Sequence, residues 1–95
     1  MAERTQDDLG DDRSLLLVDD DEPFLKRLAK AMEKRGFEVE TAETVAAGTA
    51  IATARPPAYA VVDLRLEDGN GLDVVEVLRE RRPDCRVVVL TGYGA

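Results

Sequence analysis

Four short strand-like segments alternate with three helical patterns along this chain of 95 residues. The expected strands cover residues 14–18, 37–41, 59–63 and 86–90, and the expected helices cover residues 23–35, 44–54 and 72–82. Strands and helices that alternate at this spacing predict parallel strands, right-handed crossovers and helices on both faces of one sheet. The length allows a single hydrophobic core. We therefore expect one α/β domain.

Local signals predict where the helices and the turns lie. Asp21 or Glu22 is the expected cap of the first helix, because a carboxylate there meets free amide groups. Thr44 is the expected cap of the second helix. Residues 37–41 alternate between apolar and acidic side chains, which is typical of an edge strand. Residues 68–71 predict a tight turn before the third helix.

Charge and residue types exclude several functions. With 20 acidic and 13 basic residues the net charge is −7, which disfavours binding of the chain as a whole to nucleic acid or anionic membranes. Histidine is absent, which removes the usual general base. Cys85 is the single cysteine and is expected to be a small core or strand-edge residue, not a redox thiol. No signal peptide or membrane-spanning stretch is recognisable, so we expect a cytoplasmic protein, with residues 1–13 as a disordered acidic leader.

Acidic and hydroxyl side chains follow three of the expected strands. Asp19 and Asp20 follow the first strand, Asp63 ends the third, and Thr91 follows the fourth. Because the carboxyl ends of parallel strands meet at one edge of a sheet, these side chains are expected to converge. Three converging carboxylates need protons or a hard cation, and Mg²⁺ is the better solution. The sequence therefore predicts a magnesium site with an open side.

Such a site suits phosphate chemistry. An aspartate carboxylate can attack phosphorus and form an acyl phosphate, which makes Asp63 the candidate nucleophile and Thr91 the candidate hydrogen-bond donor. Gly92 leaves room for a phosphoryl group beside Thr91. Each acid alone is more commonly a turn residue or a helix cap. Their convergence favours the site.

Three segments resemble the receiver domain of two-component response regulators. They are Leu-Val-Asp-Asp-Asp-Glu at residues 17–22, Asp-Leu-Arg-Leu-Glu-Asp-Gly-Asn-Gly at residues 63–71, and Leu-Thr-Gly at residues 90–92. The resemblance covers residues 14–95 and is strongest to the RegA/ActR-type redox-control regulators. It implies a flavodoxin-like (CheY-like) doubly wound sheet, here truncated to four strands in the order two-one-three-four and three helices.

The resemblance also implies roles for individual residues. Asp63 would accept a phosphoryl group from a sensor histidine kinase. Asp20, Asp63 and the backbone carbonyl of Arg65 would surround Mg²⁺, with Asp19 acting through water. Thr91 would be the switch hydroxyl.

Two further positions, Leu64 and Gly92, would lie close to the phosphate. The family often has proline where this chain has Glu67, which is expected to loosen the loop or to add charge near the metal.

Family members continue for another helix, strand and helix, which carry a lysine and an aromatic switch residue, and usually for a DNA-binding domain. We therefore expect a C-terminally truncated receiver that meets DNA only through a missing domain. The sheet edge and face left uncovered by the missing elements predict self-association.

Two other functions remain open. In the first, the chain is a self-associating interaction module whose acidic edge is silent. In the second, it is an aspartate-nucleophile phosphatase, although such enzymes usually carry a second aspartate where this chain has Arg65. The cluster of arginines at residues 79–82 is attributed to the dipole of the third helix.

Overall fold

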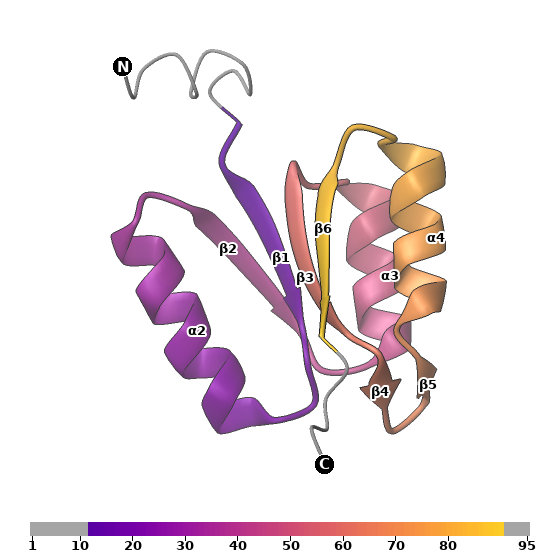
Figure 1. Cartoon of the computed structure of the whole chain (residues 1–95), viewed down its shortest axis with the longest axis horizontal. Coiled ribbons are helices and arrows are strands. Elements are labelled where there is room, and N and C mark those ends of the chain that lie inside the picture. The colour runs from indigo at the N-terminus through magenta and orange to yellow at the C-terminus, as the bar shows by residue number, and fades with distance from the viewer. Residues whose placement is uncertain (1–11, 91–95) are drawn as a thin grey trace.

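A computed structural model describes residues 12–90 of the chain. They form a parallel four-stranded sheet with the strand order β2-β1-β3-β6 and a separate two-stranded antiparallel hairpin, β4–β5 (Figure 1). The elements in chain order are β1 (Ser14–Val18), α2 (Glu22–Lys34), β2 (Glu38–Ala42), α3 (Val45–Ala54), β3 (Tyr59–Asp63), β4 (Arg65–Leu66), β5 (Gly69–Asn70), α4 (Leu72–Arg81) and β6 (Arg86–Leu90). The expected doubly wound fold and strand order are confirmed.

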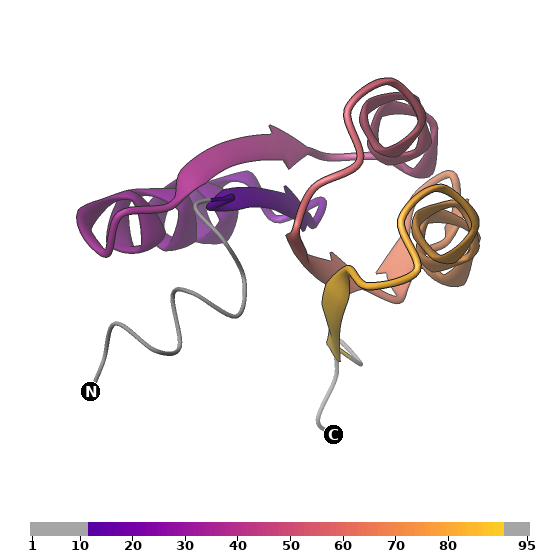
Figure 2. The same cartoon turned by 90° about the horizontal axis from the view of Figure 1, so that it is seen from above.

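Each face of the sheet has its own apolar core because side chains alternate along the central strand β1. Leu15 and Leu17 pack with Leu25 of α2, whereas Leu16 and Val18 pack with residues of α3 and α4 such as Ala52 and Leu78. Figure 2 shows α2 on one side of the sheet and α3 and α4 on the other. β2 is an edge strand, as its alternating sequence predicts.

Two of the three helices begin at the predicted caps. Asp21 Oδ1 accepts a hydrogen bond from the Phe24 amide at 3.1 Å, and Thr44 Oγ1 accepts one from the Ala47 amide at 3.0 Å. These bonds satisfy amide groups that have no partner within the helix. Cys85 is half-buried against the α3/α4 core, as predicted, and burial raises the pKa of its thiol.

The turn expected at residues 68–71 is confirmed only in part. Residues 65–70 form the β4–β5 hairpin, in which Arg65 pairs with Asn70 and Leu66 with Gly69, so the turn itself falls at residues 67 and 68. Gly69 and Asn70, which suggest a turn, form the second strand of the hairpin. The first strand is too short to show an apolar alternation, so the sequence does not reveal it.

The folded domain begins before residue 14. The Asp12 carboxylate accepts hydrogen bonds from the Ser14 amide and hydroxyl at 2.9 and 2.6 Å and forms an ion pair with Arg82 at 2.7 Å. These bonds to Ser14 and the neighbouring Arg82 lower the pKa of Asp12 to about 2. The Arg13 guanidinium lies 5.6 Å from the centre of the Phe37 ring. Asp12 and Arg13, which the prediction assigns to the leader, therefore contact the folded domain. Residues 1–11 lie outside the described part of the chain.

The arginine cluster does more than complement the α4 dipole. Arg81 donates a hydrogen bond to the Thr53 carbonyl at 3.0 Å, and Arg82 donates one to the Pro56 carbonyl at 3.1 Å. Both carbonyls lie at or just beyond the C-terminal end of α3, where backbone oxygens lack partners within the helix. The attribution to the dipole alone is therefore incomplete, because these arginines join the ends of α3 and α4.

Candidate functional site

The register of the central strands brings two aspartates side by side. Val18 pairs with Val62, so the next residues, Asp19 and Asp63, emerge together at the carboxyl edge of the sheet. Asp19 is 8% exposed and Asp63 is 7% exposed, and they are the only buried charged residues in the part of the chain that the structure describes. Asp20 follows on the exposed turn after β1.

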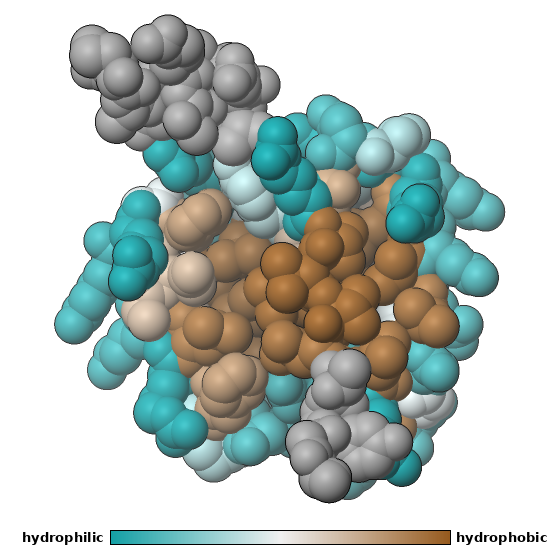
Figure 3. All heavy atoms as spheres, in the orientation of Figure 1, coloured by the Kyte–Doolittle hydropathy of each residue, from teal (hydrophilic) through white to brown (hydrophobic). Residues whose placement is uncertain are grey.

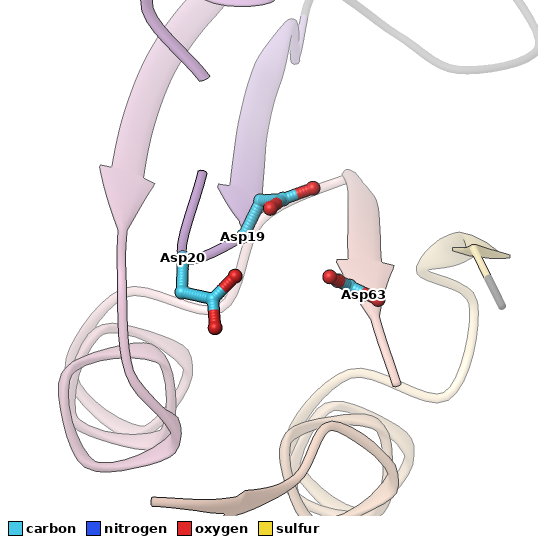
Figure 4. A group of neighbouring side chains, drawn as sticks. All are labelled: Asp19, Asp20 and Asp63. Atoms are coloured by element: carbon cyan, nitrogen blue, oxygen red, sulfur yellow. The ribbon is translucent and has the colours of Figure 1, made fainter. Parts of the chain in front are cut away.

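The carboxylates of Asp19, Asp20 and Asp63 form one cluster. One oxygen from each lies within 4.8 Å of the others, and Figure 4 shows the three groups around a common space between the ends of β1 and β3. The predicted convergence of these three acids is confirmed. Thr91 and Gly92, the other residues expected here, lie outside the described residues, so their roles stay predictions.

Backbone amides orient the two buried carboxylates. Asp19 Oδ1 accepts a hydrogen bond from the Asp21 amide at 2.9 Å, and Asp63 Oδ1 accepts one from the Arg65 amide at 3.2 Å. Each bond joins residues two apart in the sequence, which is the geometry of an Asx turn. Both side chains are thus held at the turn that follows their strand.

The electrostatics of the cluster favour a cation. Burial raises the pKa of Asp19, and the negative charges of Asp63, Asp20 and Asp21 raise it further, against the opposing hydrogen bond from the Asp21 amide. A buried carboxylate surrounded by other negative charges loses its proton less readily until a positive charge joins it. Three oxygen donors, two of them buried and one exposed, fit a hard divalent ion such as Mg²⁺ that keeps part of its water shell.

The loop after Asp63 returns tightly against the end of β3. The Gly71 amide donates a hydrogen bond to the Leu64 carbonyl at 2.8 Å, and a Cβ atom on Gly71 would lie only 2.1 Å from the Asp63 carbonyl oxygen. The Leu64 amide donates to the Leu90 carbonyl at 2.9 Å. The ends of β3 and β6 and the start of α4 therefore meet directly beside the acidic cluster.

Sequence reasoning missed two residues of this loop, Gly71 and Asp68. The sequence pattern assigns Gly71 only to a turn, whereas the close approach of its backbone to Asp63 requires a glycine there. Asp68 binds the N-terminus of α3, with hydrogen bonds from the Val45 and Ala46 amides at 2.8 and 3.1 Å. No local signal marks a contact between residues more than 20 positions apart.

Among residues 12–90, no helix is both long enough and apolar enough to cross a lipid bilayer.

Residues 15–95 match the family model of the response regulator receiver domain. The chain is 85% identical to the photosynthetic apparatus regulatory protein RegA of Cereibacter sphaeroides over 95 residues, which are 100% of this chain and 52% of that protein. It is 65% identical to the acid tolerance regulatory protein ActR of Rhizobium meliloti over 86 residues, which are 90% of this chain and 44% of that protein. The chain thus spans about half the length of these curated relatives.

The fold agrees with solved structures of the same kind. A response regulator from Burkholderia pseudomallei, crystallised with a phosphorylated aspartic acid, a calcium ion and citrate, superposes with a TM-score of 0.81 at 36% identity over 88% of this chain and 49% of that one. A CheY-like receiver domain from Methanospirillum hungatei gives a TM-score of 0.80 at 31% identity over 87% of this chain and 66% of that one. Sequence match, fold and acidic cluster agree, and the chain belongs to the response regulator receiver domain family.

Proposed function

We propose that this chain is a phosphoacceptor module that takes a phosphoryl group from a sensor histidine kinase onto Asp63. The observation that carries the proposal is the cluster of Asp19, Asp20 and Asp63 oxygens within 4.8 Å at the carboxyl edge of the sheet. The phosphorylated aspartic acid and calcium ion of the Burkholderia pseudomallei response regulator support the same use of the site.

We assign Mg²⁺ as the cation. Asp20, Asp63 and the backbone carbonyl of Arg65 would hold it, and Asp19 would contact it through water. When bound, the ion neutralises charge on the phosphoryl oxygens. The raised pKa of Asp19 supports this assignment, because burial and the neighbouring acids disfavour its negative charge when no cation is bound.

In the transfer itself, an Asp63 carboxylate oxygen forms a bond to phosphorus while the phosphorus–nitrogen bond to the kinase histidine breaks. The histidine leaves with the bonding electron pair and is protonated. The Arg65 amide, 3.2 Å from Asp63 Oδ1, orients the attacking group. Thr91 would donate a hydrogen bond to a phosphoryl oxygen, and Leu64 and Gly92 would border it.

The longer protein to which such a chain belongs would regulate transcription through a DNA-binding domain outside these 95 residues. We infer this from the receiver family and from the half of the relatives' length that the chain does not match. The chain itself then serves signalling and not metabolic catalysis.

Acetyl phosphate with Mg²⁺ tests the acceptor. We expect mass spectrometry to detect a gain of one phosphoryl group that disappears in Asp63→Asn, because the amide cannot act as the nucleophile. Asp73→Asn, which removes an exposed carboxylate from the first turn of α4, serves as the control and should keep the gain. A phosphoryl gain that persists in Asp63→Asn would contradict the assignment.

The exposed side of β6 favours an interaction role as well. Within the described residues β6 pairs only with β3, and Val88 and Val89 are 57% and 39% exposed. Figure 3 shows apolar side chains gathered on this face of the molecule. An unpaired strand edge with apolar side chains is a template for a second strand. We propose that a second copy of the chain binds there.

Light scattering tests this self-association at micromolar concentration. We expect a mass above that of the monomer, and Val88→Lys should shift it toward the monomer because a charge on the strand edge opposes pairing. Leu72→Lys introduces the same charge at an exposed apolar residue of α4 and should leave the mass unchanged. A stable monomer with cooperative unfolding would rule out the proposed dimer.

A further inference from the structure

The β4–β5 hairpin is tied to the rest of the domain at its tip. Asp68, in the turn of the hairpin, accepts hydrogen bonds through Oδ1 from the Val45 amide at 2.8 Å and through Oδ2 from the Ala46 amide at 3.1 Å. These amides open α3, a helix of 10 residues, and Thr44 already serves a third amide, that of Ala47. Since α3 already has Thr44 as its cap, the bonds to Asp68 mainly connect the hairpin to this distant helix.

The other end of the same hairpin touches the acidic cluster. Arg65, its first residue, donates its amide to Asp63 Oδ1 at 3.2 Å. The hairpin has only two paired positions, Arg65 with Asn70 and Leu66 with Gly69, so the tip and the cluster are separated by a very short ladder. A displacement at residue 68 has little structure to absorb it before it reaches Arg65.

Leu66 keeps the hairpin on the domain independently of Asp68. Its side chain is 8% exposed and belongs to the core between the sheet, α3 and α4. A substitution at Asp68 should thus leave the fold intact and loosen only the short hairpin, from its tip to Arg65. The two amide bonds also lower the pKa of Asp68, because they stabilise its charged form.

We propose that Asp68 is a positioning residue for the metal site, which it controls by fixing the hairpin that carries Arg65 and orients Asp63. The inference rests on the proposed function, because it assumes that Mg²⁺ binds at the cluster through Asp63 and the Arg65 carbonyl. Asp68 itself does not contact the ion. It holds in place the backbone that does.

Titration with Mg²⁺ alone, followed by NMR on the complete chain, tests the proposal. Asp68→Ala should weaken Mg²⁺ binding about tenfold, as is typical when a group that orients a metal ligand is removed. Asp68→Asn keeps one acceptor oxygen, so its affinity for Mg²⁺ should lie between those of Asp68→Ala and the parent protein. In the absence of metal, both variants should speed hydrogen exchange at the Val45, Ala46 and Arg65 amides.

Two matched controls separate positioning from other effects. Thr44→Ala removes a different hydrogen bond at the N-terminus of α3 and should lower stability without changing Mg²⁺ affinity. Glu67→Gln removes a charge from the adjacent residue in the same turn and should lower Mg²⁺ affinity only slightly, by the effect of the lost charge alone.

The outcomes are distinct. If Asp68→Ala and Thr44→Ala weaken Mg²⁺ binding equally, Asp68 only caps α3. If Asp68→Asn and Glu67→Gln weaken Mg²⁺ binding equally, the effect is one of charge alone. Either result overturns the inference. If the parent protein and Asp68→Ala bind Mg²⁺ with equal affinity, the inference is overturned and the proposed function is left intact. A parent protein without saturable Mg²⁺ binding overturns the proposed function first. If Asp68→Ala fails to fold, Asp68→Asn carries the same comparisons.

Discussion

Replacing Gly71 by alanine is expected to lower the free energy of unfolding by about 3 kcal/mol, at the upper end of the usual cost of overpacking. A Cβ atom at this position would lie 2.1 Å from the Asp63 carbonyl oxygen and 2.8 Å from Val62 Cγ1. The nearer atom belongs to the backbone of β3, so no change of rotamer relieves the clash. Relief requires a shift of α4 or of the end of β3, where Asp63 sits.

Denaturant unfolding of Gly71→Ala beside Gly36→Ala measures this effect. Gly36 has a φ of 96°, and no atom lies within 4 Å of the position that a Cβ would take, so its substitution costs only backbone strain of about 1–2 kcal/mol. We expect Gly71→Ala to be the less stable variant and also to weaken Mg²⁺ binding. The steric argument fails if Gly71→Ala is as stable as the parent protein.

Asp19→Asn is expected to raise the free energy of unfolding of the metal-free protein by about 1 kcal/mol at neutral pH, because it removes a charge that burial and three neighbouring acids disfavour. The amide oxygen can still accept the hydrogen bond that the Asp21 amide gives to Asp19. With saturating Mg²⁺ the parent protein should instead have the higher free energy of unfolding, because Mg²⁺ binding stabilises it more than the variant.

The pH dependence gives an independent check. Because the pKa of Asp19 is raised in the folded state above its ordinary value of 3.8, the unfolded chain loses this proton first as pH rises. The stability that Asp19 contributes is thus fully present below pH 3.8 and is lost as pH rises through the raised pKa. The difference in free energy between Asp19→Asn and the parent should grow over that window, measured by denaturant unfolding without metal. A difference in free energy of unfolding that does not change with pH would contradict the proposed cause.

Local interactions account for what could be predicted from the chain. Strand and helix positions follow from apolar spacing, and the caps at Asp21 and Thr44 follow from hydrogen bonds that span three residues. The convergence of Asp19, Asp20 and Asp63 needed one more rule, that parallel strands end at a common edge. Each inference depends on neighbours in sequence or on a general property of the fold.

The contacts that sequence reasoning missed depend on how distant segments pack. Asp12 with Arg82 and Asp68 with Val45 join residues far apart in the chain, and nothing in the adjacent sequence distinguishes them from other exposed acids. The arginines of residues 79–82 are explained only in part by the end of their own helix, because two of them donate to carbonyls at the end of α3.

The sequence by itself thus determined the alternation of strands and helices, the family, and the acids that gather at the edge of the sheet. Only the tertiary structure decided how the loop after Asp63 is held, through the close approach of Gly71 to the β3 backbone and the anchorage of Asp68 on α3. The physical reason is that hydrophobic spacing and caps act over one or two helical turns. The fit of a loop against a neighbouring strand and helix exists only once the crossovers have placed them.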